Sequence, residues 1–255
     1  MNASPLNHGA NSFRGRPPAP LITALLVALS LLAGCASTPT EEDPGSYDPF
    51  EPINRKVYTF NRAVDRALLR PVARGYDAVV PGPAKTAVTN VFDNISTPIW
   101  VLNHLLQGSF AEAGKQSVRF LLNSTVGLAG ILDTTADSGL TKNPARFDQT
   151  FGKWGIPSGP YLMLPIIGPN TPRSAVGWYA RFQTDVIWNR LEDERGLRDK
   201  LVVLEIIDQR YQLLRIDSML ERAPDPYIFV REAYKQRTEY AIRGAPEEEV
   251  FEFDD

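Results

Sequence analysis

Cysteine and histidine are almost missing from this 255-residue chain, which has one cysteine, Cys35, and two histidines, His8 and His104. One cysteine cannot form a disulfide within the chain, and a structural zinc site needs several Cys, His or carboxylate ligands. The chain also has no G-x-S-x-G, P-loop or G-x-G-x-x-G motif. We therefore expect no enzyme, no catalytic residues, no metal and no cofactor.

A surplus of positive charge is also missing. The chain has 27 Lys and Arg residues against 30 Asp and Glu residues, a formal net charge of −3. Six of the acidic residues lie among the last nine residues. Because nucleic-acid binding depends on a concentrated basic surface, we expect no nucleic-acid partner.

The position of Cys35 indicates a lipid anchor. An apolar stretch from Leu21 to Leu32 precedes it and follows the basic residues Arg14 and Arg16, which is the layout of a secretory signal peptide. The apolar stretch is too short to span a bilayer. The tetrad at residues 32–35 (Leu-Ala-Gly-Cys) resembles a bacterial lipobox, which implies removal of residues 1–34 and attachment of three acyl chains to Cys35.

Several chains anchor a protein stably, whereas one does so only marginally. Ala36 stands where an aspartate would resemble an inner-membrane retention signal, so we expect the periplasmic face of the outer membrane. In the alternative interpretation, the signal is cut at an Ala-x-Ala-like site and Cys35 is an ordinary residue of the leader.

The periodicity of apolar residues predicts a helical protein. Residues 35–47 are polar and predict an acylated tether, and Asp48 is a candidate N-cap for a helix that ends before Pro71. Further helices are expected over 83–94, 99–107, 109–122, 197–221 and 227–242. Ser109 and Glu112 form a capping-box pattern for the fourth helix, with Phe110, Val118 and Leu121 on its apolar side. The acidic residues 243–255 are typical of a disordered tail.

The segment from Trp154 to Pro172 contains no charged residue and alternates glycine and proline with apolar side chains. These residues cannot form a membrane-spanning helix, because the breaks would leave backbone polar groups unpaired in lipid. The segment is either a buried loop or a surface that contacts lipid. For the second alternative the candidates are Tyr161, Leu162, Leu164 and Ile166.

Ordered motifs along most of the chain resemble the MlaA (VacJ) family of outer-membrane lipoproteins. The first motifs are Asp48-Pro49-Phe50-Glu51-Pro52-Ile53-Asn54-Arg55 and Tyr58-Thr59-Phe60-Asn61. Asn103 to Gly108, Arg119 to Ser124 and Arg146 to Gly152 follow, and Asp225 to Tyr234 close the series. One departure is visible, because Ser174 follows Arg173 where the family usually has Asp.

The resemblance implies an all-α fold, with one domain over residues 48–242 that forms a ring around a central amphipathic channel in the inner leaflet of the outer membrane. It implies removal of mislocalised phospholipid from the outer leaflet, with phospholipid, a trimeric porin and a periplasmic lipid carrier as partners. It also places Phe60 and Asn61 in the region that sets the state of the channel.

Two other classes of function stay open. A structural lipoprotein could hold porins without moving lipid, and it would need no channel. An envelope lipid hydrolase would need a serine close to His104 or a pair of carboxylates in a cleft.

We predict that Cys35→Ala prevents acylation, because the cysteine thiol is the atom that would carry the lipid. The mutant should accumulate as a precursor or a soluble species. Labelling cells with a radioactive fatty acid measures this directly, and equal label in mutant and wild type would contradict the anchor assignment.

Overall fold

The chain divides into two units, residues 1–47 and residues 48–255. The computed structural model describes residues 48–185, 187, 191 and 194–243 of the second unit. The predicted signal peptide, Cys35, the tether and the acidic tail beyond residue 243 therefore lie outside the described residues.

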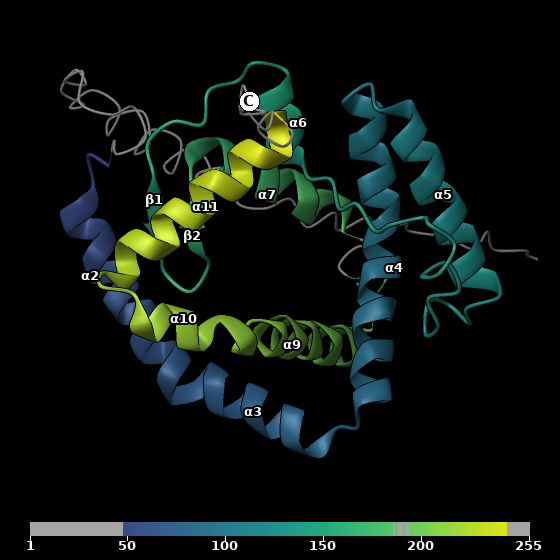
Figure 1. Cartoon of the computed structure of the whole chain (residues 1–255), viewed down its shortest axis with the longest axis horizontal. Coiled ribbons are helices and arrows are strands. Elements are labelled where there is room, and N and C mark those ends of the chain that lie inside the picture. Colours follow the sequence, from purple (N-terminus) through teal and green to yellow (C-terminus); the bar gives the residue numbers. More distant parts are fainter. Residues whose placement is uncertain (1–47, 186, 188–190, 192–193, 244–255) are drawn as a thin grey trace, which may run out of the picture. The chain divides into compact units, whose positions relative to one another are not determined.

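The described part is an all-α fold with one short hairpin (Figure 1). Its first half contains α2 (Glu51–Val64), the π-helical turn η2 (Asp65–Leu69), α3 (Arg70–Val79), α4 (Gly82–Leu106) and α5 (Phe110–Thr125). The second half contains α6 (Phe147–Lys153), β1 (Leu162–Leu164), β2 (Gly168–Asn170), α7 (Pro172–Thr184), α9 (Arg195–Gln212), the 3₁₀ turn η3 (Leu214–Ile216), α10 (Asp217–Arg222) and α11 (Pro226–Arg243). Among these helices, none has the length and apolar character needed to span a bilayer.

Contacts between these elements close into a circuit. From α2 the circuit passes through η2, α3, α9, α4, α6 and α11 to the hairpin, and β1 contacts α2 again (Figure 1). Outside this sequence of contacts, α5 packs on α4, α7 on α6, and α10 on α11. A ring of helices requires contacts that close in this way.

Two prolines that were expected to end or begin helices lie within continuous helical segments. Pro71 was expected to terminate the first helix, but it occupies the first turn of α3, directly after η2. In the π turn the backbone hydrogen bonds span five residues instead of four, and this change of pattern comes just before Pro71, which has no N–H to donate. Pro98 was expected to open a separate helix, but it lies inside α4. Packing of the flanking residues Asn94 and Trp100, both buried, outweighs the local break.

The other helix predictions were mostly correct at one end and inaccurate at the other. The N-cap of α2 is Phe50 rather than Asp48, whose carboxylate instead accepts hydrogen bonds from Asn54 and Tyr227. The α5 helix does begin after Ser109, but no side-chain cap forms there. The segment expected over 197–221 is divided into α9, η3 and α10, whereas α11 agrees with the expectation. Helices α6 and α7 were not predicted.

The uncharged middle segment forms an antiparallel hairpin, in which Leu162 pairs with Asn170 and Leu164 with Gly168. The buried-loop interpretation holds for only part of it. Met163 is buried, but Ile166 at the tip is 74% exposed. Ile166 also has a φ of 67°, a conformation that is unusual for a β-branched residue.

Two asparagines of α2 bind the main chain of this hairpin. Asn54 donates from Nδ2 to the Tyr161 carbonyl at 3.0 Å and accepts from the Met163 N–H at 2.8 Å. Asn61 repeats the pattern, donating to the Leu164 carbonyl at 2.9 Å and accepting from the Ile166 N–H at 2.8 Å. Each carboxamide thus takes the place of a neighbouring strand's peptide group.

The apolar core is small and lies beside this junction. Tyr161, Met163 and Tyr227 are buried together, with Val57 and Tyr234 among the residues packed against them. The ring of Tyr161 meets the edges of Tyr227 and Tyr234 at centroid distances of 6.2 and 6.0 Å. Burial raises the pKa of Tyr161, which keeps its phenol neutral.

The partition of residues in the described part is the reverse of that in a water-soluble protein. Eighteen of the buried residues are polar or charged and ten are apolar, while 31 large apolar residues are exposed. In α5 the buried residues include Gln116, Arg119 and Asn123, which bind the main chain or side chains of residues 133–141. Phe110 and Leu121, on the apolar side of the helix, are 71% and 60% exposed.

Ion pairs replace the missing apolar core where α3, α9 and α10 meet. Arg210 of α9 binds Asp65 of η2 at 2.6 Å and Asp217 of α10 at 2.9 Å. Arg70 binds the same Asp217 at 2.9 Å and Glu221 at 2.6 Å. The hydrogen bonds that Arg210 donates to Asp65 outweigh the opposing effect of burial and raise the pKa of the Arg210 guanidinium.

We predict that Asn54→Leu lowers the free energy of unfolding by about 2–5 kcal/mol, because it leaves a buried carbonyl and a buried N–H without partners. Asn61→Leu should cost less, since water reaches the exposed tip of the hairpin. Chemical denaturation of the two variants in detergent, followed by circular dichroism, measures the difference. A cost for Asn61→Leu that equals or exceeds the cost for Asn54→Leu would contradict this account.

Candidate lipid-binding site

A cavity of about 200 Å³ lies between α4, the start of α6, β2, α7 and α11. Pockets for drug-sized ligands have volumes of about 300–1,000 Å³. The cavity can therefore hold a head group or part of an acyl chain, but not a whole phospholipid.

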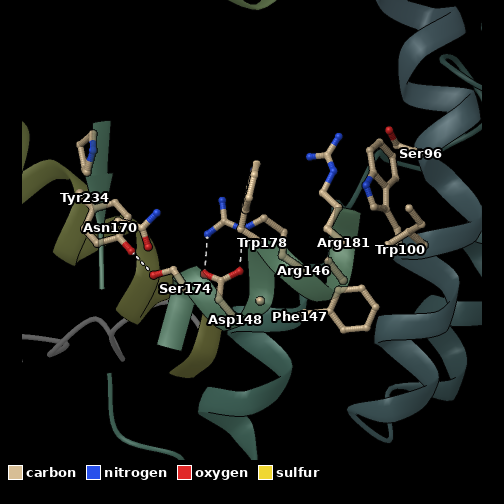
Figure 2. A pocket seen from close by; sticks show the side chains of 14 residues that line it. Ser96, Trp100, Arg146, Phe147, Asp148, Asn170, Ser174, Trp178, Arg181 and Tyr234 are labelled. Carbon is tan, nitrogen blue, oxygen red and sulfur yellow. Dashed lines mark hydrogen bonds and ion pairs between the residues drawn. The ribbon is translucent and has the colours of Figure 1, made fainter. Parts of the chain in front are cut away.

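The walls of this cavity are amphipathic. Ile99 and Trp100 of α4, Phe147 of α6 and Trp178 of α7 supply apolar surface. Figure 2 shows Trp178 and Arg181 extending from α7 on the same side, with Trp100 facing them from α4. An apolar group and an anionic group could thus be bound next to each other.

The two arginines of the cavity differ in the charge they present. Arg146 forms a bidentate pair with Asp148, with both N–O distances at 3.0 Å (Figure 2). Arg181 lies 3.4 Å from Glu205 through a single nitrogen, and 42% of its side chain is exposed. A guanidinium has five N–H donors, so Arg181 keeps donors available to a ligand.

Ser174, the residue noted above as a departure from the family motif, forms a capping box with Thr171 at the start of α7. The Thr171 hydroxyl accepts from the Ser174 N–H at 3.2 Å, and the Ser174 hydroxyl accepts from the Thr171 N–H at 3.2 Å. The Ser174 hydroxyl also lies 2.5 Å from the phenol of Tyr234 (Figure 2). The cap is therefore retained, while the negative charge of an aspartate is absent from this wall.

Gly177 allows α6 and α7 to approach closely beneath the cavity. A Cβ atom added to Gly177 would lie 2.7 Å from the backbone nitrogen of Asp148, well inside van der Waals contact. The position of the Arg146–Asp148 pair therefore depends on a glycine in α7.

The residues predicted to contact lipid lie on α2 and the hairpin, and none of them lines this cavity. Phe60 is 50% exposed and Ile166 is 74% exposed, whereas Tyr161 is 2% exposed and belongs to the core. Leu162 and Leu164 are partly exposed. Asn61 of α2 is joined to the hairpin by its hydrogen bonds with the main chain of Leu164 and Ile166. The β2 strand of the same hairpin does reach the cavity, through Pro169 and Asn170.

His104 is buried, with an exposed fraction of 5%. Its Nε2 lies 3.0 Å from the carbonyl oxygen of Asn143. Ser109 and Glu112 line a second cavity together with His104. Within the described residues, however, no hydrogen bond joins the imidazole to either side chain. The hydrogen bonding of a Ser-His-carboxylate triad is therefore not formed there.

Sequence reasoning missed the residues that form the cavity. The sequence marks Arg146, Phe147 and Asp148 only as part of a family motif, and Trp178 only as one of the tryptophans, with Trp154 and Trp188, that suit a boundary between polar and apolar surroundings. Their spacing carries no metal or nucleophile pattern, so only the tertiary contact of α6 with α7 brings them together. Of these tryptophans, Trp188 lies outside the described residues.

The fold and the cavity define a helical protein with exposed apolar side chains and a polar interior. A family model described as MlaA lipoprotein matches residues 46–241. The chain belongs to this family.

Individual relatives support the assignment over most of the chain. The intermembrane phospholipid transport system lipoprotein MlaA of Escherichia coli (strain K12) is 36% identical over 228 residues, covering 88% of this chain and 89% of that protein. The protein of the same name from Haemophilus influenzae is 31% identical, covering 87% and 90%. A solved structure described as the structural basis for maintenance of bacterial outer membrane lipid asymmetry has a TM-score of 0.67 and 34% identity, covering 76% of this chain and 98% of that one.

We predict that Gly177→Ala destabilises the protein by about 1–3 kcal/mol, because the added methyl group overpacks the contact between α6 and α7. Gly114→Ala is the matched control, since a Cβ there meets nothing within 4 Å, and a helical Gly-to-Ala change should stabilise by about 0.5–1 kcal/mol. Thermal unfolding in detergent distinguishes the two variants. Equal shifts in Tm would show that the close approach has no energetic importance.

Proposed function

We propose that this protein is an outer-membrane lipoprotein that removes mislocalised phospholipid from the outer leaflet and passes it to a soluble carrier in the periplasm. The transfer makes and breaks no covalent bond. The observation that carries the proposal is the reversed partition of the described residues, with polar side chains inside and large apolar side chains outside.

Exposed apolar side chains on this scale are favourable only where something other than water surrounds them. Because the described helices are too short or too polar to span a bilayer, these side chains fit a position within one leaflet. Amphipathic helices at the interface bury their apolar faces in this way. Acylation of Cys35 would hold the chain at the same membrane surface.

The closed circuit of contacts supports a ring with an amphipathic channel through it. A phospholipid needs an apolar surface for its tails and a polar one for its head group. The cavity beside Trp178 and Arg181 offers both kinds of surface. Phe60 of α2 and Ile166 of the hairpin are exposed and offer further apolar surface. Asn61 holds the tip of the hairpin against α2, and the β2 strand of the same hairpin reaches the cavity.

The E. coli relative is named as part of an intermembrane phospholipid transport system, and this name supports phospholipid as the cargo of the present chain. A trimeric porin and a periplasmic lipid carrier complete the proposed pathway. The porin would surround the lipoprotein at the membrane, and the carrier would receive lipid on the periplasmic face.

We predict that intact phospholipid co-purifies with the wild-type protein and that Ile166→Asp reduces its amount several-fold. An unpaired carboxylate is costly next to acyl chains, while the 74% exposure of Ile166 means that the substitution should leave the fold intact. Ile166→Asn is the matched control, which keeps the polarity and removes the charge, and it should have a smaller effect. Mass spectrometry of lipid extracted from the purified proteins gives the measurement.

Three other outcomes would contradict part of the proposal. Absence of lipid from the wild-type protein would favour the scaffold, and lysophospholipid would favour a hydrolase. Equal amounts of lipid in wild type and Ile166→Asp would show that the hairpin tip lies away from the lipid route.

A further inference from the structure

A second and larger cavity, of about 470 Å³, lies where the end of α4, the start of α5, α6 and the last turns of α11 meet. Its walls include His104, Glu112, Lys153, Arg237 and Tyr240. The volume lies within the range of pockets that bind small ligands.

The charges in this cavity do not balance. Glu112 is neutralised by Lys115 at 2.6 Å and accepts a further hydrogen bond from Asn143 at 3.1 Å. Within the described residues, Lys153 and Arg237 have no ion pair and no hydrogen bond through their side chains. Two cations therefore face the cavity without a compensating anion.

Arg237 shows the electrostatic consequence. Partial desolvation and repulsion from Arg146 lower the pKa of its guanidinium, and Asp148 offsets them only partly, although the residue is still exposed to solvent. A guanidinium in this position is less favourable than one in water. An anion bound between Arg237 and Lys153 would reverse this effect.

The imidazole of His104 supplies a polar atom that also has no partner. With Nε2–H donating to the carbonyl of Asn143 at 3.0 Å, Nδ1 is buried and finds no hydrogen-bond partner among the described residues. The neighbouring Gln107 side chain, by contrast, donates to Thr150 at 2.8 Å, and Thr150 donates to Asn103 at 2.7 Å. Buried polar groups without partners are uncommon and call for an explanation.

We infer that this cavity binds the phosphate group of a small anionic ligand, through Lys153 and Arg237, with Nδ1 of His104 accepting a hydrogen bond from a donor of the same ligand, the P–OH of free phosphate or the ammonium group of a phospholipid head group. The phosphate belongs either to a phospholipid head group or to free phosphate. Ala145 and Arg146 line both cavities, so the two cavities are adjacent. If the ligand is a phospholipid head group, an alternative that rests on the proposed transport function, the second cavity is a neighbouring binding site for the polar end of the lipid.

Calorimetric titration of the full-length acylated protein in detergent tests this inference with two soluble probes, inorganic phosphate and glycerophosphoethanolamine. We expect saturable binding, weakened about tenfold or more by Lys153→Gln and by Arg237→Gln, because each removes a charge-assisted hydrogen bond. Lys200→Gln is the matched control. It removes an exposed cation of α9 that lines neither cavity.

Binding of glycerophosphoethanolamine would support a head-group site, and binding of inorganic phosphate alone would support a free-phosphate site. Binding of neither probe would overturn the inference, and so would an equal loss in all three variants. The probes carry no acyl chains, so this result is independent of whether intact phospholipid co-purifies with the protein. Failure of the transport proposal and failure of the phosphate site can therefore be distinguished.

Discussion

The pairing of α2 with the hairpin depends on a match between helical and extended geometry. Asn54 and Asn61 are seven residues apart, which corresponds to about 10.5 Å along a helix. The peptide groups they bind are centred on Leu162 and Pro165, three residues apart, or about 10 Å along a strand. Because these lengths agree, two carboxamides on one helix face hold an extended segment in register, and the tyrosine core forms behind it.

Polar contacts also hold the rest of the described fold together. A protein whose apolar side chains face outward has little left to bury, and the described part buries arginines, aspartates and asparagines instead. Such groups are stable only when each finds a partner. Asp217 illustrates this, since it receives both Arg70 and Arg210 and so connects α3, α9 and α10. The geometry of such pairs is more specific than apolar packing.

The sequence predicted the helical class and the position of α11, and its ordered motifs indicated the family. It misjudged Pro71 and Pro98, because the local effect of proline was outweighed by a π turn in one case and by packing in the other. The apolar stripe of α5 was detected correctly but its environment was left open, since periodicity does not reveal whether an apolar face meets protein or lipid. The cavity beside Trp178 was not predictable, because it arises from contacts between α4, α6 and α7.

The order of assembly follows from how far apart the paired residues are in the chain. Helical proteins usually fold quickly, because most of their contacts are local. Here Asn54 binds residues 107 and 109 positions later, and Tyr227 binds Asp48 across 179 positions. The first described helix therefore lacks the hairpin until residue 170 has emerged, and the preceding Asp48 lacks Tyr227 until almost the entire domain has emerged. In folding kinetics this helical chain should resemble a β-protein, with slow closure and a long interval in which its ends are unpaired.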